Sequence, residues 1–191
     1  LGTPGMIVLR ILKIFSNKPV FVNIDGLEWK RDKWSKIAKL FLLISEKLAL
    51  KFADYIICDN QEIINYCKKK YGNDNLKLIS YGSDHVNVNS KSKFKISYEN
   101  YALKVCRIEK ENNIELILKS FSKFKKYNLI IIGNWSNSKY SKNLYLKYKS
   151  FKNIKLLDPI YDQNTLDFYR KNCSIYIHGH SAGGTNPSLV E

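Results

Sequence analysis

The segment 178–191 (HGHSAGGTNPSLVE) holds the residues whose types and order most directly suggest chemistry. Two glycines, a threonine and an asparagine precede Pro187, a residue that the first turn of a helix tolerates. Amides at a helix start attract anions, and glycine lets a ligand approach the backbone closely. The pattern predicts a diphosphate site, with Glu191 one turn into the helix as an acceptor for two ribose hydroxyls. The residues of this site are Gly183, Gly184, Thr185 and Asn186. A plain loop with a surface glutamate is the alternative.

Two further candidates follow predicted strands. Arg107 ends a run of apolar residues, and arginine is rare among the 32 basic residues of the chain. Asp25 closes another strand and is followed by Gly26. Ligands of α/β folds bind beyond the carboxyl ends of strands, so both positions are candidate site residues. A surface arginine and a turn-forming Asp-Gly remain the simpler alternatives.

Strand-like and helix-like runs alternate along the chain. Short β-branched runs predict strands, and apolar residues at helical spacing predict helices. The predicted strands are 19–24, 55–58, 76–81, 102–108, 128–132, 154–157 and 175–178. The predicted helices are 34–52, 61–70 (capped by Asn60 and ended at Gly72), 111–124, 140–151 and 164–171, and another opens at 186–187. Strands that are each followed by a helix indicate parallel sheets covered on both sides.

A polar stretch at residues 83–97, rich in Ser, Asn and Lys, interrupts this pattern and indicates a linker. We therefore expect an α/β fold with two Rossmann-like, doubly wound domains, 1–90 and 91–191. The chain begins at Leu1 and ends at Glu191 inside a patterned segment. We expect an internal fragment in which both domains are partial.

The composition excludes several classes of protein. The net charge is +15, but the excess is lysine spread along the chain, whereas nucleic-acid contacts favour arginine. We expect no nucleic-acid partner. No apolar run approaches the roughly 20 residues of a membrane span. The four cysteines are expected to be reduced, buried thiols, and no residues have metal-ligand spacing.

The segment that includes Trp29, Trp34 and the predicted helix 34–52 has two interpretations. The simpler one is that it builds core. The alternative is an amphipathic face, edged by lysines, that makes a peripheral contact with the membrane near a lipid-linked acceptor.

The strings around these candidates resemble a known family. The segment 178–191 is similar to the C-terminal half-site of retaining glycosyltransferases with the GT-B fold, of the family-4 type. In particular, it resembles a rhamnosyltransferase-like subgroup of bacterial polysaccharide enzymes. The strings NIDGLEWKRDKW and VCRIEKENNIEL resemble other parts of the same family.

The resemblance implies a role for each candidate. Glu191 corresponds to the second glutamate of the family's motif, which contacts the ribose of the donor. The first glutamate corresponds to Gly183, and His178 and His180 are close enough in sequence to share its role. Arg107 corresponds to an arginine that clamps the diphosphate.

Two further positions complete the implied site. The family's lysine, five residues after the clamping arginine, corresponds to Asn112, and Lys110 could help. Asp25 stands where many members have a histidine that faces the reacting sugar. It could bind an acceptor hydroxyl or stabilise positive charge on the sugar ring. The expected catalytic residues are Asp25, Arg107 and His180. The expected donor-binding residues are Arg107, Asn112, His178, Gly183, Gly184, Thr185, Asn186 and Glu191.

The resemblance thus implies a hexosyl-type glycosyltransferase for surface polysaccharide such as capsule or lipopolysaccharide. Residues 1–90 would form the later part of an acceptor-side domain, and 91–191 the earlier part of a domain that binds the nucleotide-sugar. The expected partners are a nucleotide-sugar donor, with rhamnose as the suggested sugar, and a saccharide or lipid-linked acceptor. The nucleotide-sugar is a substrate, so no cofactor or metal is expected.

The reaction would retain the anomeric configuration, in the cytoplasm at the inner face of the plasma membrane. The alternatives are a nucleotide-sugar epimerase of GT-B fold and a basic, non-enzymatic binding protein.

Overall fold

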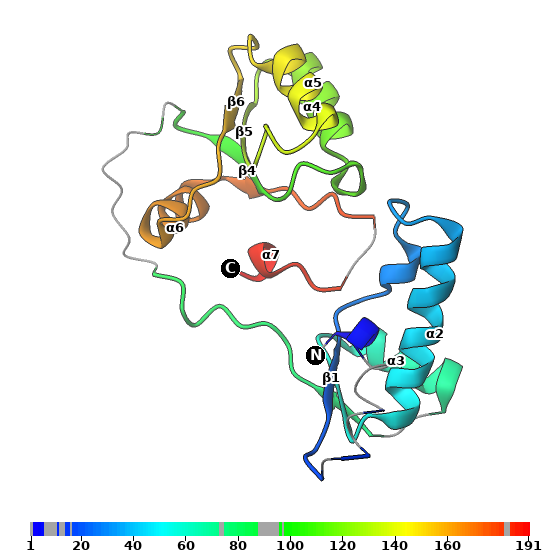
Figure 1. The fold of residues 1–191 in the computed structure, drawn as a ribbon. Coiled ribbons are helices and arrows are strands. Elements are labelled where there is room, and N and C mark those ends of the chain that lie inside the picture. Colours follow the sequence, from blue (N-terminus) through cyan, green and yellow to red (C-terminus); the bar gives the residue numbers. More distant parts are fainter. Residues whose placement is uncertain are drawn as a thin grey trace. The chain divides into compact units, whose positions relative to one another are not determined.

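The computed structural model describes residues 2–5, 11, 14–15, 17–72, 75–87, 96, 98–181 and 184–191. The chain divides into two compact units (Figure 1). Unit 1 is Leu1–Tyr81 with Ala182–Pro187, and unit 2 is Gly82–Ser181 with Ser188–Glu191. The predicted domain boundary between residues 90 and 91 lies outside the described residues, as does Gly183.

Unit 1 is a three-stranded parallel sheet with the order β1-β2-β3. Its strands are β1 (Phe21–Ile24), β2 (Tyr55–Cys58) and β3 (Leu76–Leu78). Its helices are η1 (Thr3–Gly5), η2 (Glu28–Lys30), α2 (Lys36–Phe52) and α3 (Gln61–Tyr71). The predicted ends of α3 are confirmed, because the Asn60 side chain accepts from the amide of Ile63 at 2.9 Å and Gly72 is left-handed at φ 61°.

The described residues of unit 1 bury one face of this sheet. Val22, Ile24 and Ile56 lie in the core with α2 and α3. The alternate residues Phe21 and Tyr55 stack with ring centroids 4.9 Å apart and stay exposed. Among the described residues, burial therefore alternates along β1 and β2, as it does in a half-covered sheet.

A buried carboxylate fixes the helices of unit 1. Glu46 of α2 accepts hydrogen bonds from the hydroxyls of Tyr66 (2.7 Å) and Tyr71 (2.6 Å) and from Nε1 of Trp29 (3.1 Å). The Lys70 ammonium lies 3.6 Å from the same carboxylate. Burial, followed by the hydrogen bond to Glu46, raises the pKa of both tyrosines above the usual range. Trp29 thereby holds η2, and the loop after β1, against α2 and α3.

Helix α2 has features of both interpretations of its segment, core and amphipathic face. Leu42, Ala49 and Leu50 are buried, but the opposite side of the helix carries exposed apolar residues. Helical periodicity identifies an apolar stripe but does not say whether a partner covers it. In the part of the chain that the structure describes, no helix is long and apolar enough to cross a bilayer.

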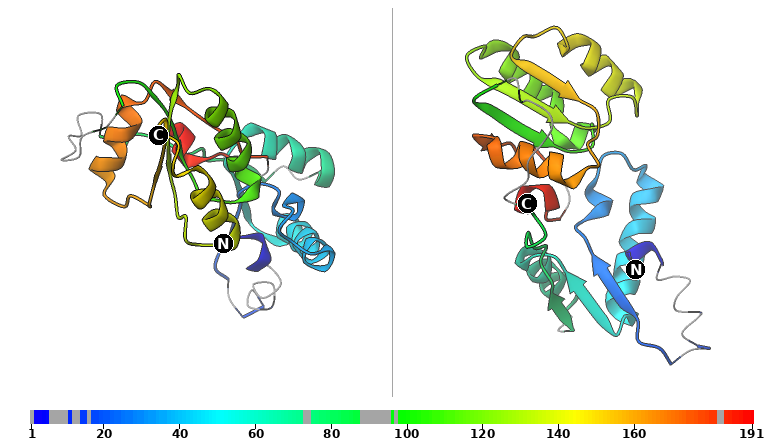
Figure 2. Two further views of the ribbon diagram at one scale, coloured as in Figure 1. Left: turned by 90° about the horizontal axis from the view of Figure 1, so that it is seen from above. Right: turned by 90° about the vertical axis from the view of Figure 1, so that its left-hand side faces the viewer.

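Unit 2 is a four-stranded parallel sheet with the order β6-β5-β4-β7. Its strands are β4 (Tyr101–Val105), β5 (Asn128–Ile132), β6 (Ile154–Leu157) and β7 (Ile175–Tyr176). Its helices are η3 (Lys110–Asn112), α4 (Ile114–Lys123), α5 (Lys139–Tyr148), α6 (Gln163–Asn172) and α7 (Pro187–Val190). The first residue of α7, Pro187, belongs to unit 1, and the rest of α7 belongs to unit 2. Figure 2 shows the sheet and its helices from two further sides.

Both faces of the unit 2 sheet are covered, as predicted. Leu129 and Ile131 face α4 and α5, whereas Leu103 and Ile130 face α6. The chain runs outward from β4 through β5 to β6 and then returns to the other side of β4 as β7. The carboxyl ends of β4 and β7 therefore form a topological switch point, where α/β sheets bind ligands.

One helix of unit 2 starts later than predicted. The sequence predicts a helix from residue 111, but α4 begins at Ile114. Asn113 adopts a left-handed backbone (φ 52°), which ends the short η3 and separates it from α4.

The four cysteines, Cys58, Cys67, Cys106 and Cys173, are free thiols, and the first two are buried.

Candidate functional site

Two loops of unit 2 meet at the switch point. The loop after β4 carries Arg107, and the loop after β7 carries His178 and His180. Asn113 Nδ2 donates to the Gly179 carbonyl at 2.7 Å. A second link joins Ser181, whose amide donates to the Glu111 carbonyl at 2.9 Å. The structure thus ties together the two loops that carry these predicted site residues.

Arg107 presents its guanidinium outward from this edge. Its side chain is 69% exposed, and Nη1 lies 3.9 Å from the carboxylate of Glu109. Asn112 is buried, and its Nδ2 donates to the Arg107 carbonyl at 2.5 Å. Asn112 therefore supports the backbone of Arg107, while the exposed guanidinium is available to an anion.

His178 and His180 form a stacked pair beside this loop. Their ring centroids are 4.6 Å apart, with an interplanar angle of 25°. Burial lowers the pKa of His178, and the positive charge of Lys104 lowers it further. A neutral imidazole carries one donor and one acceptor, which suits the hydroxyls of a sugar.

Lys104 was not among the predicted site residues. It is 1% exposed in the middle of β4, and its ammonium donates to the Ile177 carbonyl at 3.4 Å. Burial lowers the pKa of Lys104. The signal was visible in the sequence, because a lysine interrupts an otherwise apolar strand (YALKV) and lysine is rarely buried. Lys104 places positive charge beneath the loop that holds both histidines.

Substitution of Lys104 tests this electrostatic link. A nearby positive charge disfavours the imidazolium, so Lys104→Met should raise the pKa of His178, measured by NMR titration of the imidazole. Lys119→Met, which removes an exposed lysine of α4, is the control and should leave this pKa unchanged. An unchanged or lower pKa in Lys104→Met would contradict the link.

The two loops approach each other closely at Gly179. A Cβ atom at this position would lie 2.9 Å from the Asn112 carbonyl oxygen and 3.1 Å from Cδ1 of Ile117. Gly179→Ala should therefore force the loops apart and lower the free energy of unfolding by roughly 1–3 kcal/mol, as overpacking does. Urea unfolding measures the change. Gly82→Ala is the control, because its Cβ would meet only Asp84 Oδ2 at 3.7 Å. Equal stability of the two variants would contradict the predicted close approach.

Glu191 lies in a second polar cluster of unit 2. Its Oε2 accepts a hydrogen bond from Nη2 of Arg170 in α6, and its Oε1 lies 3.0 Å from Nε2 of His85. Arg170 also contacts Asp167 (3.2 Å) and the hydroxyl of Ser188 (3.2 Å). The Arg170 and Glu191 side chains are largely buried. His85 was not among the predicted site residues, and the structure makes it a partner of Glu191.

Asp25 lies at the corresponding edge of unit 1, beside a second carboxylate. The last residues of β1 and β2, Ile24 and Cys58, pair in register, so Asp25 and Asp59 follow neighbouring strands. The charge of Asp25, then burial and the charge of Asp59, raise the pKa of Tyr81. Asp59 is buried and was not predicted, although the strand-end rule that selected Asp25 applies to it equally.

The described part of the predicted glycine loop belongs to unit 1. The Thr185 amide donates to Asp59 Oδ2 at 2.5 Å, and Asn60 Nδ2 donates to the Thr185 hydroxyl at 3.3 Å. A Cβ at Gly184 would lie 3.2 Å from the carbonyl carbon of Asp25. The sequence predicts outward-pointing amides here, but that of Thr185 already binds a carboxylate. Asn186 precedes the short α7.

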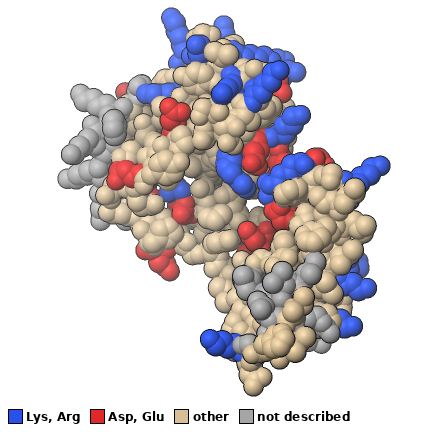
Figure 3. All heavy atoms as spheres, viewed as in Figure 1, with Lys and Arg blue, Asp and Glu red and all other residues tan. Residues whose placement is uncertain are grey.

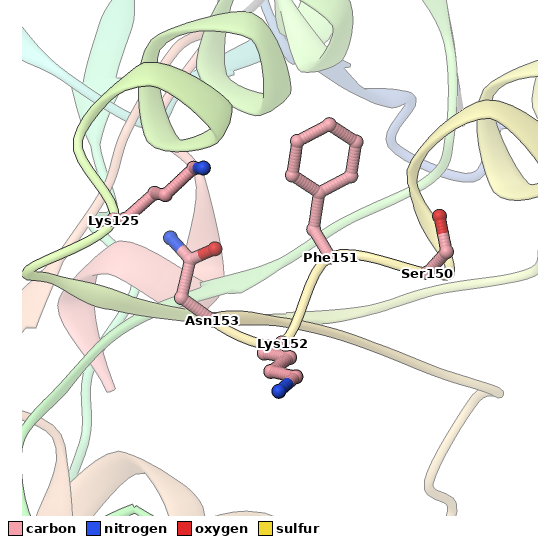
Figure 4. A pocket seen from close by; sticks show the side chains of 5 residues that line it. All are labelled: Lys125, Ser150, Phe151, Lys152 and Asn153. Carbon is pink, nitrogen blue, oxygen red and sulfur yellow. The ribbon is translucent and has the colours of Figure 1, made fainter.

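A shallow hollow of about 510 Å³ lies elsewhere in unit 2 (Figure 4). Its lining residues are Lys125, Ser150, Phe151, Lys152 and Asn153. They precede β5 and β6, at the edge opposite the switch point. The Asn153 amide is already used in bonds to the carbonyls of Phe121 (2.9 Å) and Tyr127 (3.0 Å). The hollow is therefore not the candidate site. Among the residues that the structure describes, no group of three or more His, Cys, Asp or Glu side chains could hold a metal ion.

Two protein-family models match this chain, one over each part of it. Residues 8–84 match the model "Domain of unknown function (DUF1972)". Residues 85–191, more than half of the chain, match the model "Glycosyl transferases group 1". No curated protein matches the sequence significantly.

Solved structures share the fold at low sequence identity. TarM superposes with a TM-score of 0.69 at 14% identity, over 98% of this chain and 37% of that chain. An S. aureus structure of a TarM mutant is in complex with fondaparinux, alpha-GlcNAc-glycerol and UDP. The pneumococcal O-GlcNAc transferase GtfA, in complex with UDP and GlcNAc, superposes with a TM-score of 0.52 at 10% identity. The match covers 90% of this chain and 35% of that chain.

A third similar structure is the Methanocaldococcus jannaschii UDP-GlcNAc 2-epimerase. It superposes with a TM-score of 0.50 at 15% identity, over 91% of this chain and 59% of that chain. The chain thus spans less than two thirds of each of these structures. With a parallel α/β sheet in each unit, the fold is that of the GT-B proteins, and the chain belongs to the glycosyl transferases group 1 family.

Proposed function

We propose that this chain is part of a glycosyltransferase that moves a hexosyl group from a nucleotide-sugar to a saccharide or lipid-linked acceptor. The observation that carries the proposal is the switch-point edge of unit 2, where Arg107 and the stacked His178 and His180 lie on linked loops. The product would be a bacterial surface polysaccharide such as capsule or lipopolysaccharide. Rhamnose is the proposed sugar, transferred with retention of configuration on the cytoplasmic side of the membrane.

Arg107 is the proposed partner of the departing diphosphate. Sugar transfer leaves negative charge on the nucleoside diphosphate, and a positioned guanidinium stabilises that charge as it develops. The exposed guanidinium, with its backbone held by Asn112, suits this role. The proposed chemistry needs no metal and no cofactor, because the nucleotide-sugar is itself a substrate.

The donor's hydroxyls are proposed to bind the histidines and Glu191. His178 and His180 would accept hydrogen bonds from the sugar hydroxyls or donate hydrogen bonds to them. Glu191 would accept from the two ribose hydroxyls. A carboxylate has more lone pairs than its contacts with Arg170 and His85 use, and those contacts fix its orientation. The loop residues Gly183, Gly184, Thr185 and Asn186 are also proposed to bind the donor, with the amides that are not hydrogen-bonded to Asp59 directed at its diphosphate.

Asp25 is the proposed group on the acceptor side. Glycosyl transfer passes through a transition state that resembles an oxocarbenium ion, which a carboxylate can stabilise. Asp25 could instead accept a hydrogen bond from the attacking hydroxyl. Asp59 and Tyr81 belong to the same strand-end cluster of unit 1 and would shape the acceptor site.

A nucleotide-sugar epimerase is the second candidate function, because an UDP-GlcNAc 2-epimerase is among the similar structures. The two reactions differ in one requirement. A transferase releases nucleoside diphosphate and builds a glycosidic bond only when an acceptor is present, whereas an epimerase changes the sugar without an acceptor.

The test is to incubate the full-length protein with UDP-, dTDP- and GDP-sugars in EDTA, with and without a lipid-linked saccharide extract as acceptor. Mass spectrometry follows the products. We expect a glycosylated acceptor and nucleoside diphosphate at the same rate with and without EDTA. An epimerised donor without acceptor would favour the second function. Strict dependence on added metal would contradict the proposed chemistry.

A further inference from the structure

Helix α2 presents two different apolar faces. One of them, which includes Leu42 and Leu50, is buried in unit 1. On the other face, positions 37, 40, 41 and 44 follow the i, i+3, i+4, i+7 spacing of a single helical stripe. We call these residues the α2 stripe. They are Ile37 (83% exposed), Leu40 (59%), Phe41 (47%) and Ile44 (47%). Single exposed apolar residues are ordinary, but a continuous stripe on one helix marks an interaction surface.

Lysines flank the α2 stripe. Lys36, Lys47 and Lys51 of α2 are exposed, and Lys33 precedes the helix. Basic side chains lie along the side of unit 1 that carries α2 (Figure 3). The helix has one acidic residue, Glu46, and it is buried among Trp29, Tyr66 and Tyr71. Before the helix, Asp32 is fully exposed and lies 3.6 Å from Lys39. The exposed charge around the stripe is therefore mainly positive.

We propose that the α2 stripe and its flanking lysines form a docking surface for an anionic phospholipid membrane. A helix that joins an apolar stripe to a lysine-rich border lies in the plane of a membrane interface, with the apolar side chains among the acyl chains and the ammonium groups at the headgroups. Long lysine side chains reach the headgroups while their stems stay on apolar surface. The excess of lysine selects an anionic lipid over a neutral one. An apolar protein partner would need no such border.

Vesicle sedimentation tests this surface in the full-length protein. The probes are vesicles of phosphatidylcholine alone and of equal parts phosphatidylcholine and phosphatidylglycerol. We expect binding to the anionic vesicles only, and weaker binding as salt is raised. Each replacement of Lys36, Lys47 or Lys51 by Gln should weaken binding by about fivefold. The double variant Ile37→Ser/Ile44→Ser should weaken it by on the order of 100-fold, because its apolar side chains no longer enter the bilayer.

A matched variant controls for the loss of exposed apolar surface. Leu116 of α4 and Leu146 of α5 are 62% and 63% exposed, and Leu116→Ser/Leu146→Ser should bind vesicles like the parent protein. Circular dichroism and thermal unfolding should be unchanged in both double variants, since all four positions are exposed.

Three results would overturn the proposal. The first is no binding to anionic vesicles, and the second is equal binding by the Ile37→Ser/Ile44→Ser variant. The third is protection of Ile37→Cys from a thiol reagent in the full-length monomer or in a dimer, because the stripe is then covered by protein. Vesicle binding needs neither donor nor acceptor, so its failure leaves the proposed sugar transfer untouched.

Discussion

Replacement of Arg107 by alanine in the full-length protein is expected to lower turnover by about 100- to 1,000-fold, the usual loss when one donor to a developing anion is removed. The physical reason is that the guanidinium stabilises charge on the leaving diphosphate more strongly in the transition state than in the bound donor. Steady-state kinetics with saturating acceptor measure the effect, and kcat should fall more than the donor KM rises. Arg107→Lys should recover part of the loss, because lysine keeps the charge without the bidentate geometry.

Lys119→Ala is the control for Arg107→Ala, since it also removes an exposed positive charge, from α4 of the same unit. Its kcat should match that of the parent protein. Full activity of Arg107→Ala, with an unchanged thermal unfolding midpoint, would remove Arg107 from the site.

Replacement of Glu191 by alanine should affect both stability and donor binding. The Arg170 and Glu191 side chains are 8% and 14% exposed, and removal of one partner from a buried pair costs about 3–5 kcal/mol. Arg170 keeps its contact with Asp167 in this variant, so the loss of unfolding free energy should lie near the lower end of this range. Weaker binding of the donor is expected as well, because hydrogen bonds from the ribose hydroxyls to the carboxylate are lost. Urea unfolding and calorimetric titration separate the two effects.

Glu115→Ala is the matched control for Glu191→Ala. Its carboxylate lies 3.7 Å from Lys147, and both side chains are more than half exposed. Exposed pairs of this kind contribute about 0–1 kcal/mol, so stability should change little. If Glu191→Ala unfolds at the same urea concentration as Glu115→Ala, the Arg170–Glu191 pair does not stabilise unit 2.

Much of the fold follows from the sequence because its signals are local. The alternation of strands and helices, the Asn60 cap and the Gly72 stop depend on neighbouring residues, and the structure has all of them. The predicted start of α4 was wrong by one turn, because the sequence around Asn113 does not indicate that this residue adopts a left-handed backbone. For helix α2 the sequence left core and an exposed amphipathic face as alternatives, because periodicity gives an apolar face without its partner.

The candidate site was predictable where it depends on strand ends. Arg107 and His178 follow parallel strands that neighbour each other, so their loops meet at one edge. The contacts of Glu191 were not predictable, because it pairs with His85 across 106 positions of sequence. The contact between Thr185 and Asp59 spans 126 positions. Such pairs depend on how distant segments pack, which spacing along the chain does not encode.

The most direct test of the nucleotide-sugar site is calorimetric titration of the full-length protein with UDP-, dTDP- and GDP-sugars in EDTA. Selective binding of one donor class, weakened in Arg107→Ala and unchanged in Lys119→Ala, is the expected result. Absence of binding to all three by the folded protein would contradict the account.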